Sequence, residues 1–234
     1  MNFKNQEKLK AITFSYDDGV VQDIRLIELL NKYNLKATFN LNSKLFSEPG
    51  ILHINNRSVC QYRLSEKDIK EIYKDHEIAA HTLTHPLLTE LSEEEIINEV
   101  ETDRKNLSEL LGYEVIGFAY PGGGVNNDDR VAEIIKNKTG VKYCRTTKSS
   151  FGFDIGENLY RLDPTVHEYD FNRMMALGKE FVELKTDTPK VFYVWGHSYE
   201  MDITEDFWQK LEEFFKLISN KDDIFYGTNR EVLL

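Results

Sequence analysis

The sequence predicts an α/β fold, namely a distorted (β/α) barrel of about seven parallel strands within a single domain over residues 1–234. Short apolar runs alternate along the chain with longer segments whose apolar residues have helical spacing, a pattern typical of βαβ units and a parallel sheet. The chain has 234 residues, a length at which barrels commonly form one domain. Seven or so strand–helix repeats in this length favour a barrel over an open sheet.

In the first half of the chain, strands and helices are expected in alternation. The expected strands are residues 11–16, 36–41, 76–81 and 114–121, and the expected helices are 21–33, 65–74 and 92–111. The longest helix is marked at both ends, because Ser92 and Glu95 form a capping-box pattern and Gly112 is a natural C′ residue. Residues 43–63 are predicted to be a long irregular loop, and loops of this length are often functional.

The second half of the chain continues the alternation. The expected helices are residues 128–140, about 170–184 and 204–219, and the expected strands are 141–144, 190–197 and a last one at 224–227. We find no internal repeat and no linker that would divide the chain.

The composition excludes some classes of partner. The formal net charge of −11 argues against a nucleic acid partner, because neutralising phosphates requires clustered lysine and arginine. Cys60 and Cys144 are far apart and are expected to be reduced thiols. The chain has no apolar run of 18 residues, so no membrane span is expected. Its first ten residues are polar and show no signal peptide, which predicts a cytoplasmic location, or an extracellular one if a leader was removed.

Polar clusters follow the predicted strands at their carboxyl ends. In a parallel barrel these ends lie on one face, and that face holds the active site. We therefore expect distant parts of the sequence to meet there. The clusters are Asp17-Asp18, His81, Pro121-Gly122-Gly123 and His197.

His81 and His85 are four residues apart, a spacing that can hold one metal ion. Pro86 disfavours helical dihedrals at His85, which places the pair on a loop. The pair alone could equally be one exposed and one packed histidine, and Asp17-Asp18-Gly19 alone could be a capped turn. Together, two histidines and a carboxylate would leave an open metal position for water, as in a hydrolytic site.

The segments SYDDG (15–19), HTLTHP (81–86) and FAYPGGG (118–124), with the late strand that ends in His197, resemble the ordered motifs of the polysaccharide deacetylase family. The resemblance spans about residues 12 to 197 and implies a distorted (β/α) barrel, in agreement with the alternation of elements. It also implies that Asp18, His81 and His85 bind a divalent metal, with zinc (Zn²⁺) expected.

The same resemblance assigns roles to further residues. Asp17 would be the general base that takes a proton from metal-bound water, and His197 the general acid that protonates the leaving group. The backbone N–H of Gly122, which follows Pro121, would help to hold the oxyanion. Two adjacent aspartates are needed because one carboxylate cannot both bind the metal tightly and act freely as a base.

The sequence departs from the family pattern at the third motif, R-x-P-x-G, where Ala119 stands in place of the arginine. Arg145 could supply a replacement guanidinium, or it could be a surface arginine. The fourth motif, an aspartate–tryptophan pair, is not evident. His167 in that region could line the pocket or be structural.

Two aromatic residues are candidates for substrate contacts. Trp195, near the fifth motif, could form an apolar wall for an acetyl methyl group or stack on a sugar face. Tyr120 could contact substrate or serve in packing.

The expected function is the removal of an acetyl group from an N-acetylated or O-acetylated saccharide by a metal-dependent hydrolase. Two alternatives stay open. One is a hydrolase of non-peptide C–N bonds in a small amide. The other is a degenerate carbohydrate-binding protein without turnover, which the missing arginine leaves open.

Overall fold

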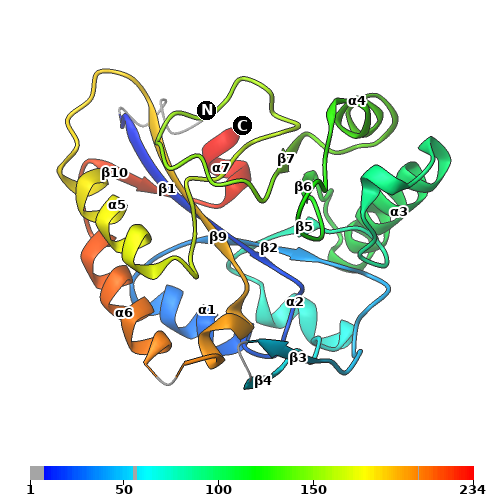
Figure 1. Cartoon of the computed structure of the whole chain (residues 1–234), viewed down its shortest axis with the longest axis horizontal. Coiled ribbons are helices and arrows are strands. Elements are labelled where there is room, and N and C mark those ends of the chain that lie inside the picture. The colour runs from blue at the N-terminus through cyan, green and yellow to red at the C-terminus, as the bar shows by residue number, and fades with distance from the viewer. Residues whose placement is uncertain (1–7, 55–56, 205) are drawn as a thin grey trace.

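Seven parallel strands form the path of a sheet that curls into a half-barrel (Figure 1). This is a computed structural model, and it describes residues 8–54, 57–204 and 206–234. The strand order is β7-β6-β5-β2-β1-β9-β8, and β10 pairs with β1 off this path. The bounds are β1 Lys10–Asp17, β2 Ala37–Leu41, β5 Glu77–Ala80, β6 Gly117–Ala119, β7 Tyr143–Arg145, β8 Val166–His167, β9 Lys190–Gly196 and β10 Ile224–Tyr226. The predicted α/β fold with about seven parallel strands is confirmed.

β1 is the centre of the sheet, and all eight of its residues are buried. It pairs with β9 along one edge, whereas β10 and β2 share the other edge, β10 near its start and β2 near its end. A strand buried on both faces is expected where helices cover a parallel sheet. This arrangement brings the ends of β1, β2 and β9 together.

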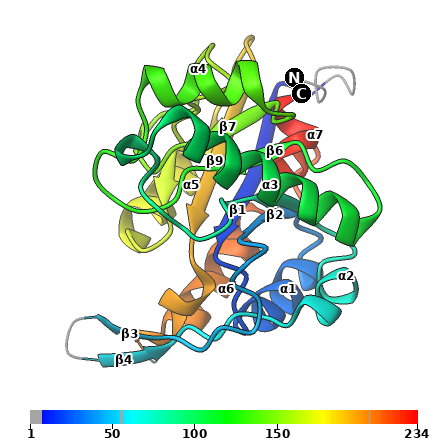
Figure 2. The same ribbon diagram turned by 90° about the vertical axis from the view of Figure 1, so that its right-hand side faces the viewer.

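Helices pack around the curled sheet, with α3 beside α4 and α5 beside α6 (Figure 2). Their bounds are α1 Asp23–Lys32, α2 Ile69–Ile72, α3 Glu93–Leu111, α4 Asp129–Lys138, α5 Phe171–Glu183, α6 Phe207–Ile218 and α7 Asn229–Leu233. Short 3₁₀ helices accompany them, among them η2 Glu66–Asp68, η3 Leu88–Glu90 and η4 Ser198–Asp202. Within the described residues, no helix combines the length and apolar character needed to cross a bilayer.

The ends of α3 are formed as the sequence predicts. The Ser92 side chain accepts a hydrogen bond from the backbone N–H of Glu95, and the Glu95 side chain accepts one from the backbone N–H of Ser92. Gly112 follows the helix with φ 82°, in the left-handed region that glycine adopts at little cost. Local side-chain chemistry therefore fixes both ends of this helix.

The prediction of an irregular loop over residues 43–63 is wrong in part. The segment contains an antiparallel hairpin of β3 (Ile51–Ile54) and β4 (Arg57–Cys60), which projects from the body (Figure 2). Ile51 is 62% exposed and Val59 is buried, so the hairpin has too few buried apolar residues to show the alternation of a half-buried strand in the sequence. The helix expected over 65–74 is shortened to η2 and α2, and the brief elements β8 and α7 were not predicted.

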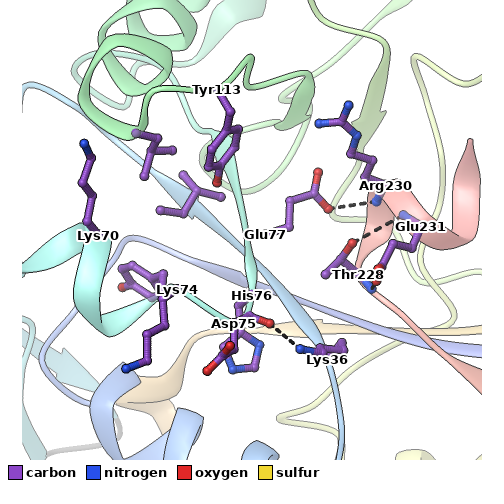
Figure 3. A pocket seen from close by; sticks show the side chains of 13 residues that line it. Lys36, Lys70, Lys74, Asp75, His76, Glu77, Tyr113, Thr228, Arg230 and Glu231 are labelled. Atoms are coloured by element: carbon purple, nitrogen blue, oxygen red, sulfur yellow. Dashed lines mark hydrogen bonds between the residues drawn. The ribbon is translucent and has the colours of Figure 1, made fainter.

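The amino ends of the strands are closed by α7, which docks through Glu77 (Figure 3). The Glu77 carboxylate accepts hydrogen bonds from the Thr38 hydroxyl at 2.8 Å, the Tyr143 hydroxyl at 2.9 Å and the backbone N–H of Arg230 at 2.8 Å. A hollow of about 710 Å³ lies beside this contact. This end of the barrel is thus fixed by polar docking, and the predicted site residues lie elsewhere.

Candidate active site

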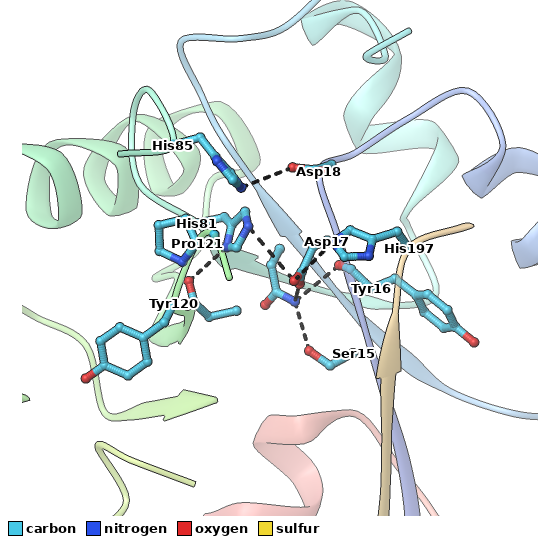
Figure 4. A network of polar contacts seen from close by, with 12 residues as sticks. Ser15, Tyr16, Asp17, Asp18, His81, His85, Tyr120, Pro121 and His197 are labelled. Carbon is cyan, nitrogen blue, oxygen red and sulfur yellow. Dashed lines mark hydrogen bonds and ion pairs between the residues drawn. The ribbon is translucent and has the colours of Figure 1, made fainter. Parts of the chain in front are cut away.

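A cleft of about 520 Å³ lies at the carboxyl ends of the strands (Figure 4). β1 ends at Asp17, β5 ends one residue before His81, and β9 ends one residue before His197. Parallel strands present their carboxyl ends on one face, which is why residues far apart in sequence meet here. The predicted site residues that line the cleft are Asp17, Asp18, His81, His85, Tyr120, Gly122, Trp195 and His197.

Asp17 is almost wholly buried, with 1% of its surface exposed. The Nη2 atom of Arg145 donates hydrogen bonds to both of its carboxylate oxygens at 2.5 Å, and the Asn40 amide donates to Oδ1 at 2.7 Å. Burial opposes ionisation of Asp17, but the charge of Arg145, followed by those of His81 and His197, outweighs it and lowers the pKa of Asp17. Asp17 is therefore a fixed carboxylate, ionised at neutral pH.

Arg145 does not line the cleft and lies behind Asp17. It is the last residue of β7 and has no exposed surface, so the alternative of a surface arginine is wrong. Its Nε atom donates to the Ser15 hydroxyl at 3.0 Å, and its guanidinium lies 4.5 Å from the centre of the Trp195 ring. These contacts fix the guanidinium against the carboxylate.

Asp18, His81 and His85 form a group that could hold a metal ion, with ligand atoms within 4.8 Å of one another. The Nε2 atom of His85 lies 3.7 Å from Oδ1 of Asp18. The Nδ1 atom of His81 is 2.8 Å from the carbonyl oxygen of Ala119, and donation there leaves the Nε2 lone pair of His81 for the cleft. Burial lowers the pKa of His81 to about 4, which keeps this imidazole neutral, as a metal ligand must be.

The backbone at two of these residues is strained. Asp18 has φ 81° and His85 has φ 63°, both in the left-handed region that non-glycine residues seldom adopt. Such conformations cost of order 1–3 kcal/mol each and concentrate at functional sites. Here they turn both side chains toward the same point, as Figure 4 shows.

Two residues that the sequence did not identify hold the Asp18 carboxylate. Gln61 donates to Oδ2 at 3.0 Å, and Arg63 donates to Oδ1 at 3.0 Å and to the Asp18 carbonyl at 2.7 Å. Burial alone would raise the pKa of Asp18, but the nearby charges of His197, Arg63, His81 and His85 lower it. An ionised carboxylate has about four acceptor positions, so these bonds leave capacity for a cation.

His197 lies on the other side of Asp17. Its Nε2 atom is 3.9 Å from Oδ2 of Asp17, and its Nδ1 atom is 3.6 Å from Oε2 of Glu200. Burial would lower the pKa of His197, but Glu200 raises it to about 9. Glu200 was not predicted, although its position three residues after His197 in η4 would have indicated it.

The remaining candidates have different surroundings. Trp195 borders the cleft and packs against His167, with ring centres 4.3 Å apart. Gly122 has φ 75°, and a Cβ there would lie 2.7 Å from the Leu87 side chain, so glycine is required beside Pro121. The Tyr120 hydroxyl donates to the Tyr160 carbonyl at 2.8 Å and its ring points away from Asp17 (Figure 4), which favours its packing role.

The fold and the cleft together define an α/β protein with a two-histidine, one-carboxylate group at the carboxyl ends of a curled parallel sheet. The polysaccharide deacetylase family profile matches residues 4–143, which is more than half of the chain. The chain belongs to the polysaccharide deacetylase family.

Curated relatives agree with this assignment. The chain is 28% identical over 129 residues to a peptidoglycan-N-acetylglucosamine deacetylase of Listeria monocytogenes, covering 54% of this chain and 24% of that protein. It is 34% identical over 122 residues to chitin deacetylase 1 of Cryptococcus neoformans, covering 51% of this chain and 22% of that protein. The match thus spans about a quarter of the length of these relatives.

The fold is shared with the Xyl-CE4 domain of a multidomain xylanase from the hindgut metagenome of Trinervitermes trinervoides. The TM-score is 0.61 at 17% sequence identity, over 97% of this chain and 89% of that one. At this identity the likeness concerns the fold alone.

Proposed function

We propose that this chain is a metal-dependent deacetylase that removes an acetyl group from an N-acetylated or O-acetylated saccharide. One observation carries the proposal. The ionised Asp17 lies between His81 and His197, with Oδ2 3.9 Å from the Nε2 atom of each imidazole. The Asp17 carboxylate thus lies between His81, a member of the potential metal-binding group, and the protonated His197.

The donor set of Asp18, His81 and His85 fits a divalent cation, and we propose zinc because imidazole and carboxylate donors suit it. The free Nε2 atom of His81 and the two backbone conformations that aim Asp18 and His85 support this fit. A cation bound there would lower the pKa of a water molecule and polarise the acetyl carbonyl group.

Asp17 would act as the general base. Because its pKa is lowered, it is a weak base and can remove a proton only from water that has been made more acidic. The bonds from Arg145 and Asn40 hold its carboxylate in one orientation, so proton transfer needs little rearrangement.

His197 would act as the general acid. With a pKa of about 9 it carries a proton at neutral pH, and the Nε2 atom can donate that proton to the leaving nitrogen or oxygen. Gly122 borders the same cleft, and its backbone N–H is our proposed donor to the oxyanion. Trp195 would supply an apolar wall beside the acetyl methyl group.

The test is acetate release from a panel of acetylated chitooligosaccharides and acetylated xylo-oligosaccharides with the zinc-loaded protein. We expect acetate from at least one of them, and a loss of about 10²–10⁴-fold in the Asp17→Asn variant. Asp187→Asn, at an exposed position, is the matched control. Ammonia release from small amides instead of acetate would favour hydrolysis of non-peptide C–N bonds. Sugar binding without any product would favour a binding protein.

A further inference from the structure

Three potential ligand atoms meet behind the proposed acid, away from Asp18, His81 and His85. They are Nε2 of His167, Nδ1 of His197 and Oε2 of Glu200, and they lie within 4.8 Å of one another. Each is buried and makes no hydrogen bond among the described residues. Oε2 of Glu200 is at ion-pair distance from both imidazoles, but buried polar atoms are normally hydrogen-bonded as well, so three that lie together without hydrogen bonds need an explanation.

The distances match a metal coordination shell better than a hydrogen-bonded chain. Oε2 of Glu200 lies 3.2 Å from Nε2 of His167 and 3.6 Å from Nδ1 of His197. At 3.2 Å the first pair is within hydrogen-bond distance, but neither atom is in a hydrogen bond in the part of the chain that the structure describes. Zinc bonds of about 2.0–2.2 Å in a tetrahedron place neighbouring ligand atoms roughly 3.3–3.6 Å apart, with their lone pairs directed at the centre and not at each other.

The three residues are supplied by neighbouring elements of the sheet edge. His167 ends β8 and is paired in register with Trp195 of β9, and His197 and Glu200 follow β9 directly. The pairing of His167 with Trp195 fixes the end of β8 beside the segment that carries the other two residues. Glu168, the next residue after His167, is fully buried beside Gly196 but is not part of this group of three.

We propose that His167, His197 and Glu200 form a second divalent-cation site, which binds zinc. It is separate from the site of Asp18, His81 and His85. Zinc would bind the Nδ1 lone pair of His197 and displace the proton from that nitrogen into solvent. His197 would keep one proton on Nε2 as a neutral imidazole, a much weaker acid than imidazolium. Occupancy of the second site therefore inhibits the general acid.

The second site should be the weaker one at neutral pH. Gln61 and Arg63 hold the Asp18 ligand of the first site in place, whereas no hydrogen bond from the described part of the chain holds the three ligand atoms of the second site. The proposed binding of a second zinc ion does not depend on the proposed function, but the proposed inhibition of deacetylation does. Binding and catalysis are therefore measured separately.

The test is equilibrium dialysis of the metal-free protein against Zn²⁺, followed by elemental analysis. We expect two zinc ions per chain, one tight and one weaker. His167→Gln should keep only the tight ion, and His85→Ala only the weaker one. His53→Gln, an exposed histidine of β3, should keep both. A single zinc ion in the unaltered protein, or two in His167→Gln, would overturn the proposal.

Glu200→Gln provides a second route to the same answer if His167→Gln does not fold, since it also removes a ligand of the weaker ion alone. For catalysis, acetate release is measured at one and at several equivalents of zinc, each variant relative to its own rate at one equivalent. The unaltered protein should be inhibited several-fold and His167→Gln should not. Equal inhibition of both would contradict the proposed site. Absence of acetate from every sample would count against the proposed function, while the dialysis would still decide the second site.

Discussion

Arg145 and Ala119 are direct partners in the pairing of β7 with β6. Ala119 stands where the family pattern has its arginine, and its carbonyl oxygen accepts the hydrogen bond from His81. Arg145 reaches Asp17, 128 residues earlier in the chain, from the adjacent strand position. The guanidinium is therefore supplied one strand further along the sheet, which weakens the argument that a missing arginine marks a protein without turnover.

Replacing Arg145 tests this relationship. Arg145→Ala would leave the buried Asp17 carboxylate without its partner, which destabilises a protein by about 3–5 kcal/mol. We expect a matching fall in the free energy of unfolding, measured by urea denaturation, and a loss of most acetate release. Arg145→Lys should recover stability better than activity, because lysine lacks the planar donor geometry.

The control for Arg145 is Arg173→Ala, which removes an exposed ion pair with Asp170. Surface pairs contribute about 0–1 kcal/mol, so its stability should change little. Full turnover in Arg145→Ala would show that the guanidinium has no part in orienting Asp17.

Replacing Asp17 and replacing Asp18 should have different effects on zinc binding and on activity. Asp17→Asn should keep tightly bound zinc and lose about 10²–10⁴-fold in kcat, because only the base is removed. Asp18→Asn should lose zinc itself, because a ligand is removed. Elemental analysis and acetate release on the same samples separate the outcomes. Loss of zinc in Asp17→Asn, or its retention in Asp18→Asn, would reverse the two assignments.

The pair of His197 and Glu200 predicts the alkaline limit of activity. Activity requires the protonated form of His197, so the rate should fall as pH rises through its pKa of about 9. Glu200→Gln removes the charge that raises this pKa, so the limit should move to lower pH, toward the ordinary value of about 6.5. The measurement is the pH profile of kcat/KM with one equivalent of zinc.

Glu213→Gln, on the exposed face of α6, should leave that profile unchanged. The same pair affects stability with a defined sign. Because the folded-state pKa of His197 is raised, its contribution is full below about pH 6.5 and is lost as pH rises through about 9. An alkaline limit at the same pH in Glu200→Gln and the unaltered protein would exclude Glu200 as the partner of His197.

The strand-end residues can be predicted from the sequence because parallel topology alone brings them together. Asp17, His81 and His197 each follow an apolar strand, and three parallel strands must end on one face. The ends of α3 were equally accessible, since a capping box is a local interaction between Ser92 and Glu95. In both cases the residues close in sequence are enough to predict the position of the side chain.

The residues that support the site could not be found in this way. Gln61 and Arg63 reach Asp18 because the segment after β4 runs beside residues 19–21, which follow β1, and no local pattern encodes that path. Arg145 could be proposed but not distinguished from a surface residue, because its burial depends on how tightly β7 packs against β6. Contacts between side chains that are brought together by the path of a loop can be identified only from the three-dimensional structure.

Arg63 offers the sharpest test of that support. Its guanidinium donates to both the carboxylate and the backbone carbonyl of Asp18, so it fixes the left-handed residue that must present a ligand. Loss of such supporting bonds typically costs 10–100-fold in metal affinity. We therefore expect Arg63→Ala to weaken zinc binding at the tight site by that factor, measured by competition with a chromogenic chelator. Gln61→Ala, which removes one bond to Asp18, should weaken it less.

Arg57→Ala is the matched control, because Arg57 lies in the hairpin just before Arg63 but donates to the carbonyl of Ile203 instead. If the effect of Arg63→Ala came from general loosening of the hairpin, Arg57→Ala would weaken zinc binding to the same extent. If it comes from the contact with Asp18, only Arg63→Ala and Gln61→Ala will do so, and the zinc affinity of Arg57→Ala will equal that of the unaltered protein. We therefore expect the loss of zinc affinity to be largest for Arg63→Ala, smaller for Gln61→Ala and absent for Arg57→Ala. This order would show which hydrogen bonds hold Asp18 in place.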